Sequence, residues 1–214
     1  NNQRKIENVL QPILHDYFQG EDAQSLLGEK ESGHVMGTII EDRCGVFLSE
    51  NGWDIVKEVN KLGEEKARAH SDFNIVIKTD VNRVNVKFSG EKNGQPNICS
   101  IRRVLDSLHK GEIDAYYLLK VKHNRLTNTT QVFFVDILDY LDCVTYNGGT
   151  GQLMLKEKNF YETYGNVPER TLEEKRIMLF DLYDTKMNEH IILKEKQRIK
   201  YREQREEFEN RYTN

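Results

Sequence analysis

The sequence predicts an α/β domain with a mixed central β-sheet flanked by helices, followed by a long, charged helical region. Two observations predict this fold class. The spacing of apolar residues changes from about 3.6 to about 2 near residue 72, and strand-like and helical segments both follow. Helices, a strand hairpin, a helix, further strands and final helices are the order expected for a mixed sheet packed against helices.

The first elements are expected to be helical. Ile6, Leu10 and Leu14 fall on one face of a helix near the N-terminus. A second helical segment is expected over residues 31–52 and a third over residues 53–71. Alternating apolar residues then predict strands over 73–77 and 84–88, and the polar sequence TDVNR between them predicts a hairpin turn.

The alternation continues in the second half of the chain. A polar loop over 90–98 precedes a short helix over 99–112, and strand-like runs cover 114–124 and 129–141. Residues 145–155 contain several glycines and predict a loop.

From Arg170 to the end the pattern is helical and highly charged. Ile177, Phe180, Met187 and Ile191 are expected to form its apolar side. We therefore divide the chain into an α/β domain over residues 1–169 and a charged helical extension over 170–214.

Charge, cysteine content and the length of apolar runs limit the possible partners and cellular location of the protein. A formal net charge of −4 neither indicates nor excludes binding to nucleic acid, which depends on local basic surface. Cys44, Cys99 and Cys143 are far apart and odd in number, so we expect free thiols in a reducing cytoplasm. No apolar run approaches the length of a membrane span, and we expect no membrane association.

The predicted hairpin carries candidate catalytic residues. Asp72 begins its first strand, and Asn85 and Lys87 point to one face of its second strand, so the three side chains are expected to meet. Carboxylates at such a place hold a divalent cation that activates water and polarises a phosphate, and oxygen ligands favour Mg²⁺. A lysine beside them stabilises developing negative charge.

At these residues the chain resembles the PD-(D/E)XK nuclease superfamily, and within it the type II restriction endonucleases. Asp72 and Lys87 match the motif, whereas Ser71 stands for the usual proline and Asn85 for the acidic residue. The resemblance extends over roughly residues 30–160. It implies a restriction-endonuclease-like fold, a homodimer, and a glutamate on the preceding helix that Glu41 matches.

Asn85 leaves three interpretations open. An amide oxygen ligates a metal but adds no negative charge, so a cation is held less strongly. Asn85 is either an engineered replacement of aspartate, or a natural residue compensated by another acid, or the mark of a pseudonuclease. Glu41 is the best compensating acid, and Asp106 is a poorer one.

DNA contacts are expected from the polar and glycine-rich connections beside the sheet, because binding residues concentrate on such loops. Amide side chains offer donors and acceptors to base edges, and arginines contact phosphates or bases. The candidates are Asn93, Gln95, Asn97, Arg102, Arg103, Asn147, Thr150 and Gln152.

The sequence thus predicts a sequence-specific, Mg²⁺-dependent endonuclease that cuts double-stranded DNA, with Asp72, Asn85 and Glu41 at the metal and Lys87 assisting the attack. Two alternatives stay open. One is a repair or junction nuclease of the same fold, and the other is a DNA-binding protein without catalytic activity.

Overall fold

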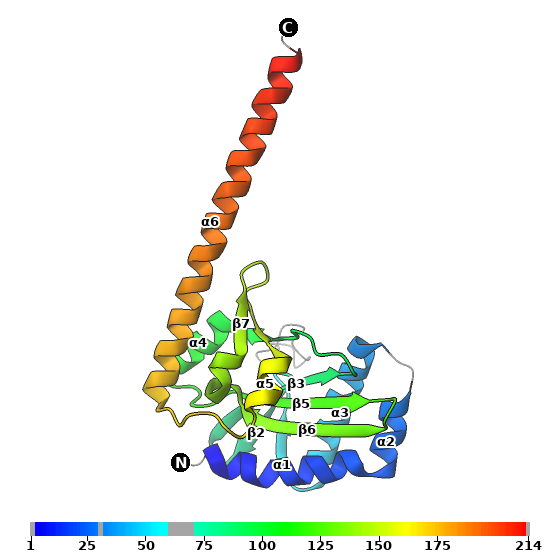
Figure 1. The fold of residues 1–214 in the computed structure, drawn as a ribbon. Helices are drawn as coiled ribbons and strands as arrows, with labels where there is room; N and C mark the ends of the chain where they lie inside the picture. Colours follow the sequence, from blue (N-terminus) through cyan, green and yellow to red (C-terminus); the bar gives the residue numbers. More distant parts are fainter. Residues whose placement is uncertain (1–2, 30–31, 60–70, 213–214) are drawn as a thin grey trace.

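A five-stranded mixed sheet forms the centre of the computed structural model, which describes residues 3–29, 32–59 and 71–212 (Figure 1). Its strands follow the order β1-β2-β3-β5-β6. They are β1 (Asp54–Val56), β2 (Phe73–Ile77), β3 (Asp80–Ser89), β5 (Tyr117–Asn124) and β6 (Thr129–Asp136). Three of the four strand pairs are antiparallel, and β3 and β5 are parallel.

The parallel pairing of β3 with β5 requires a connection that crosses one face of the sheet. Parallel neighbours need a long crossover connection, and here it consists of β4 (Asn97–Ser100) and α4 (Ile101–His109). The register places Lys87 beside Lys120, so the side chains of these two residues emerge next to each other on one face.

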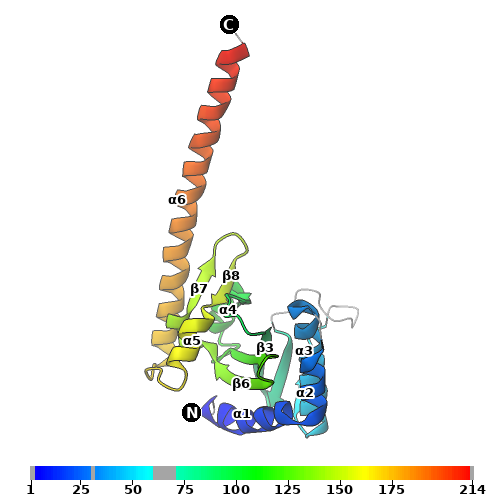
Figure 2. The same cartoon turned by 45° about the vertical axis from the view of Figure 1, so that its right-hand side comes forward.

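Three helices cover the opposite face: α1 (Gln3–Gln19), α2 (Glu21–Gly28) and α3 (Gly33–Glu50) (Figure 2). Leu10 and Leu14 of α1 are fully buried against the sheet, as the periodicity predicts. The Gln11 side chain fixes α1 to β6, since its amide nitrogen donates to the Val132 carbonyl at 2.7 Å. In α3, the Ser32 hydroxyl caps the first turn by accepting the Val35 N–H.

A second layer covers the face that carries Lys87. A three-stranded sheet of order β4-β8-β7 contributes β7 (Val144–Asn147) and β8 (Gln152–Leu155). The short helices η1 (Ile137–Cys143) and α5 (Glu157–Thr163) and the beginning of α6 (Leu172–Tyr212) complete this layer. The central sheet therefore lies between two hydrophobic cores, one on each face.

Helix α6 extends far beyond the α/β body (Figure 1). It begins with a capping box, in which the Glu174 N–H bonds to the Thr171 hydroxyl and the Thr171 N–H bonds to the Glu174 carboxylate. Leu179 is fully buried in the core, so the first turns of α6 share that core. Residues 191–211 are all exposed.

The predicted fold class is confirmed as a mixed central sheet flanked by helices with a long C-terminal helix. The expected third helix is wrong where it is described, because Asp54–Val56 forms strand β1 and pairs with β2. The preceding Gly52 has a φ of +85°, which lets the chain turn sharply after α3. Residues 60–70 of that expected helix lie outside the described residues.

Other expectations are wrong in detail. The predicted turn over 79–83 is mostly strand, since β3 begins at Asp80, and residues 137–141, expected as strand, belong to the short helix η1. The glycine-rich stretch 145–155 forms the β7–β8 hairpin, and only its tip is a loop.

On α6, Ile177, Phe180 and Ile191 are about half exposed, whereas Leu179 and Met187 face the core. The helix carries apolar residues on more than one side, and periodicity alone does not show which side the domain covers.

Candidate functional site

Asp72 is held in a defined position where β2 and β3 pair. Its own N–H donates to the Val84 carbonyl at 2.9 Å, and the Val86 N–H donates to its carboxylate at 2.5 Å. Lys87 Nζ lies 3.8 Å from Asp72 Oδ2, and roughly a quarter of each side chain is exposed. The hairpin therefore brings Asp72 and Lys87 together, as the motif predicts.

Glu41 approaches the same place from α3. Its neighbour Ile40 is fully buried against the sheet, which sets Glu41 at the border of the helix–sheet contact. Burial, and then the negative charge of Asp72, raises the pKa of Glu41 to about 7, while Lys57 and Lys87 act in the opposite direction. Glu41 is thus within electrostatic range of both motif residues.

Asn85 lies two residues before Lys87 on β3 and is more deeply buried than Lys87. Only 6 % of it is exposed, and its amide oxygen is buried without a hydrogen-bond partner among the described residues. The side chain is hydrogen-bonded to Tyr116. An unpaired buried amide oxygen is costly, and a bound cation or its water would satisfy it.

The ligand atoms present are of the kind that binds a magnesium ion, but they carry less negative charge than a site with three carboxylates. Glu41 and Asp72 supply carboxylates and Asn85 supplies an amide oxygen, which are the hard ligands that Mg²⁺ prefers. Within the described ranges, no group of three His, Cys, Asp or Glu residues is placed to hold a metal. Asp106 does not add a charge there, since it is exposed on α4.

A buried ion pair lies next to Lys87. Lys120 Nζ is 2.5 Å from Glu157 Oε1, and both side chains are almost fully buried. Burial lowers the pKa of Lys120, and the Glu157 carboxylate opposes that shift. The other oxygen of Glu157 accepts the Gly94 N–H at 2.7 Å, so this pair also fixes the loop that follows β3.

The predicted DNA-contacting residues fall into two groups. Asn93 and Gln95 are exposed on the loop after β3, and Asn97 is exposed at the start of β4. Asn93 accepts a hydrogen bond from Lys122 at 2.7 Å. The second group surrounds the β7–β8 hairpin.

In that second group, Gln152 pairs with both Asn147 and Ser100. The Ile101 N–H donates to the Gly151 carbonyl at 3.3 Å, which brings the start of α4, with exposed Arg102, to the hairpin. Arg103, also on α4, is partly buried.

Part of the second group has a local structural role. Asn147 Oδ1 accepts the N–H groups of Gly149 and Thr150 at 3.0 and 3.3 Å, so it stabilises the hairpin tip. Its amide nitrogen contacts the sulfur of Met154 at 3.8 Å. Thr150 is exposed at the tip, whereas Gln152 is partly buried.

Sequence reasoning missed Tyr116, Lys120 and Glu157. Lys120 and Tyr116 lie on the Lys87 face because β5 is parallel to β3, and that pairing joins segments about thirty residues apart. The alternation of side chains along residues 117–124 could have indicated which of them share a face, but not which face meets Lys87.

The comparisons add no family assignment. The sequence matches no protein-family model, and no curated protein matches it significantly. No helix of the described part of the chain is long and apolar enough to cross a membrane.

Proposed function

We propose that the protein is a Mg²⁺-dependent endonuclease acting on double-stranded DNA, of the type II restriction kind and with a restriction-endonuclease-like fold. One observation carries the proposal. Two separate elements, α3 and the β2–β3 hairpin, bring Glu41, Asp72 and Lys87 within electrostatic range of one another, beside the unpaired amide oxygen of Asn85. A carboxyl group with a raised pKa, here Glu41, grouped with a lysine is typical of functional sites.

Each residue has a role that follows from its position. Asp72, Glu41 and the Asn85 oxygen would hold the magnesium ion, which supplies charge neutralisation at the phosphate when bound. Lys87 is partly exposed, so its ammonium group can reach a phosphate oxygen and stabilise charge that develops there. The exposed amides after β3 would contact the DNA.

The proposed setting is a homodimer in a reducing cytoplasm. A dimer with two-fold symmetry would match a palindromic site. Cys44, Cys99 and Cys143 are buried and free, as suits a reducing compartment.

A DNA-binding protein without catalytic activity is the second candidate. Asn85 favours it, because the described residues then offer the cation only two carboxylates, those of Glu41 and Asp72. A repair or junction nuclease of the same fold would share the site and differ in the DNA that it cuts.

Cleavage by the Asn85→Asp variant separates these candidates. The added carboxylate should tighten Mg²⁺ binding and raise the cleavage rate by about tenfold or more. The measurement is Mg²⁺-dependent cleavage of plasmid and mixed-sequence DNA by both proteins. Asn124→Asp is the matched control, because Asn124 uses its oxygen to accept the Leu126 N–H, as aspartate also would.

Discrete bands support the restriction enzyme, whereas random degradation or cutting confined to branched DNA supports the repair nuclease. Strong cleavage by the unchanged protein would mean that Glu41 compensates for Asn85. If neither protein cuts any DNA with Mg²⁺ or Mn²⁺, the nuclease proposal is wrong.

A further inference from the structure

A buried hydrogen-bonded chain runs from the candidate site to the neighbouring strand. Tyr116 immediately precedes β5, and it is only 1 % exposed. The β3–β5 register pairs Asn85 with Leu118, so Tyr116 and Asn85 lie on the same face of the sheet. Their side chains are hydrogen-bonded, and Tyr116 is also hydrogen-bonded to the Cys99 thiol.

These hydrogen bonds determine which atom of the Asn85 amide contacts Tyr116 and which stays unpaired. The amide oxygen has no partner within the described part of the chain, so it is the amide nitrogen that donates to the Tyr116 hydroxyl. That hydroxyl keeps its own proton for the sulfur of Cys99. A half-turn of the amide would leave its nitrogen buried without an acceptor, and its oxygen would gain a hydrogen bond only by taking the Tyr116 proton away from Cys99.

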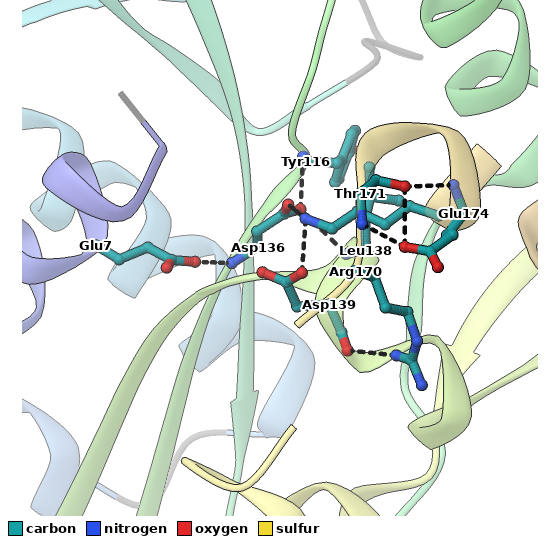
Figure 3. Close-up of polar contacts among 9 residues, drawn as sticks. Glu7, Tyr116, Asp136, Leu138, Asp139, Arg170, Thr171 and Glu174 are labelled. Atoms are coloured by element: carbon teal, nitrogen blue, oxygen red, sulfur yellow. Dashed lines mark hydrogen bonds and ion pairs between the residues drawn. The ribbon is translucent and has the colours of Figure 1, made fainter. Parts of the chain in front are cut away.

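Tyr116 is itself anchored through its main chain (Figure 3). Its N–H donates to Asp136 Oδ1 at 3.0 Å, and its carbonyl accepts the Ile137 N–H at 2.9 Å. Asp136 in turn pairs with Lys175 of α6 at 3.0 Å. The main chain of Tyr116 is therefore held in place, and this fixes the position of its side chain relative to Asn85.

From these contacts we infer that Tyr116 is a positioning residue, which keeps the amide oxygen of Asn85 free to bind a divalent cation. The inference rests on the proposed function for the identity of the ligand. It also explains how asparagine works at this place, because an amide, unlike a carboxylate, has only one end that binds a cation.

A double-mutant cycle tests the inference through Mn²⁺ affinity, measured by electron paramagnetic resonance without DNA. Tyr116→Phe keeps the ring in the core and removes the hydroxyl, and we expect about fivefold weaker Mn²⁺ binding. With Asn85→Asp in the same chain the loss should disappear, since either carboxylate oxygen can face the cation. Tyr117→Phe is the matched control: that hydroxyl, buried on the opposite face, makes no hydrogen bond to any described residue, and its loss should leave affinity unchanged.

Nuclear magnetic resonance of the metal-free protein supplies a second readout. In the unchanged chain, the side-chain amide protons of Asn85 should show contacts to the Tyr116 ring and slow exchange with solvent. Absence of those contacts would overturn the inference, even if Tyr116→Phe failed to fold. Equal Mn²⁺ affinity in Tyr116→Phe and the unchanged protein, or a loss that Asn85→Asp does not restore, would also overturn it.

The Mn²⁺ measurements distinguish failure of the cation site from failure of the positioning role. If no variant, including Asn85→Asp, binds Mn²⁺, then the cation site and the positioning role are both wrong. If the unchanged protein binds Mn²⁺ and only the Tyr116 effects are absent, the positioning role alone is wrong and the proposed function stands.

Discussion

Asp72 and Lys87 lie side by side, but only the Asp72 side chain is hydrogen-bonded to the backbone of the hairpin. The Asp72 carboxylate accepts the Val86 N–H, so it has a structural contact in addition to its proposed ligand role. Among the residues that the structure describes, Lys87 has a single long ion pair, 3.8 Å, with Asp72, and its side chain is partly exposed. A substitution at Lys87 should therefore affect chemistry more than folding.

We expect Lys87→Ala to lower the rate of DNA cleavage at least about a hundredfold and to change DNA affinity by a few-fold at most, because the ammonium group acts on charge that develops in the transition state. Single-turnover cleavage and fluorescence anisotropy on the same DNA provide the two measurements. Lys158→Ala, on the exposed side of α5, is the control. Unchanged cleavage by Lys87→Ala would remove this residue from the proposed site.

At the scale of elements, the β7–β8 hairpin depends on α6. The Tyr146 hydroxyl donates to the Met187 sulfur at 3.2 Å, and the two rings of Tyr146 and Tyr183 pack edge to face. At the tip, Gly148 lies so close to His190 that an added Cβ would be 2.7 Å from the imidazole. Glycine is required here by close approach, and the hairpin carries several predicted DNA contacts.

Gly148→Ala should therefore destabilise the protein, by about 1–3 kcal/mol if the hairpin has to move. Removing the imidazole with His190→Ala in the same chain should recover most of that loss. Urea denaturation of the two single variants and the double variant measures the coupling. Gly28→Ala is the control, because a Cβ there meets nothing within 4 Å. An equal loss with and without His190 would show that the close approach is not the cause.

For the whole molecule, a buried cluster of charges joins α1 to the start of α6 (Figure 3). The Asp136 N–H of β6 donates to Glu7 of α1, and Lys175 of α6 lies 2.6 Å from Asp139 and 3.0 Å from Asp136. Burial, together with the charges of Asp136 and Asp139, raises the pKa of Glu7 from 4.5 to about 7.

This shift makes stability depend on pH. A carboxyl group whose pKa is higher in the folded state binds a proton more tightly there than in the unfolded chain. Its contribution is complete below about pH 4.5 and is lost as pH rises through about 7. Glu7→Gln keeps an acceptor for the Asp136 N–H but does not ionise, so stability should fall less between pH 5 and pH 8 than in the unchanged protein.

Urea denaturation at both pH values tests this prediction. Glu41, whose pKa is also about 7, contributes a decline of the same sign to both proteins, so it cancels in the comparison. Identical pH dependence with and without Glu7 would contradict the assignment.

The sequence by itself determined the class of fold and the centre of the candidate site. Helical and strand periods are local, and they predicted α1, α3 and the β2–β3 hairpin. The two strand patterns placed Asp72 and Lys87 on one hairpin, where alternate residues share a face. Asn85 and Lys87 were assigned to one face of β3 for the same reason. The register of the hairpin came from the structure, because the turn is formed by residues 78–79 and not by the predicted segment 79–83.

Only the tertiary structure decided what surrounds that centre. The parallel pairing of β3 with β5 brings Tyr116 and Lys120 to Asn85 and Lys87. The three-residue strand β1 was missed because it is too short to show a period. The face of α6 that binds the domain was also missed. Such choices depend on contacts between distant segments and on the burial that results, and no local pattern of residues encodes them.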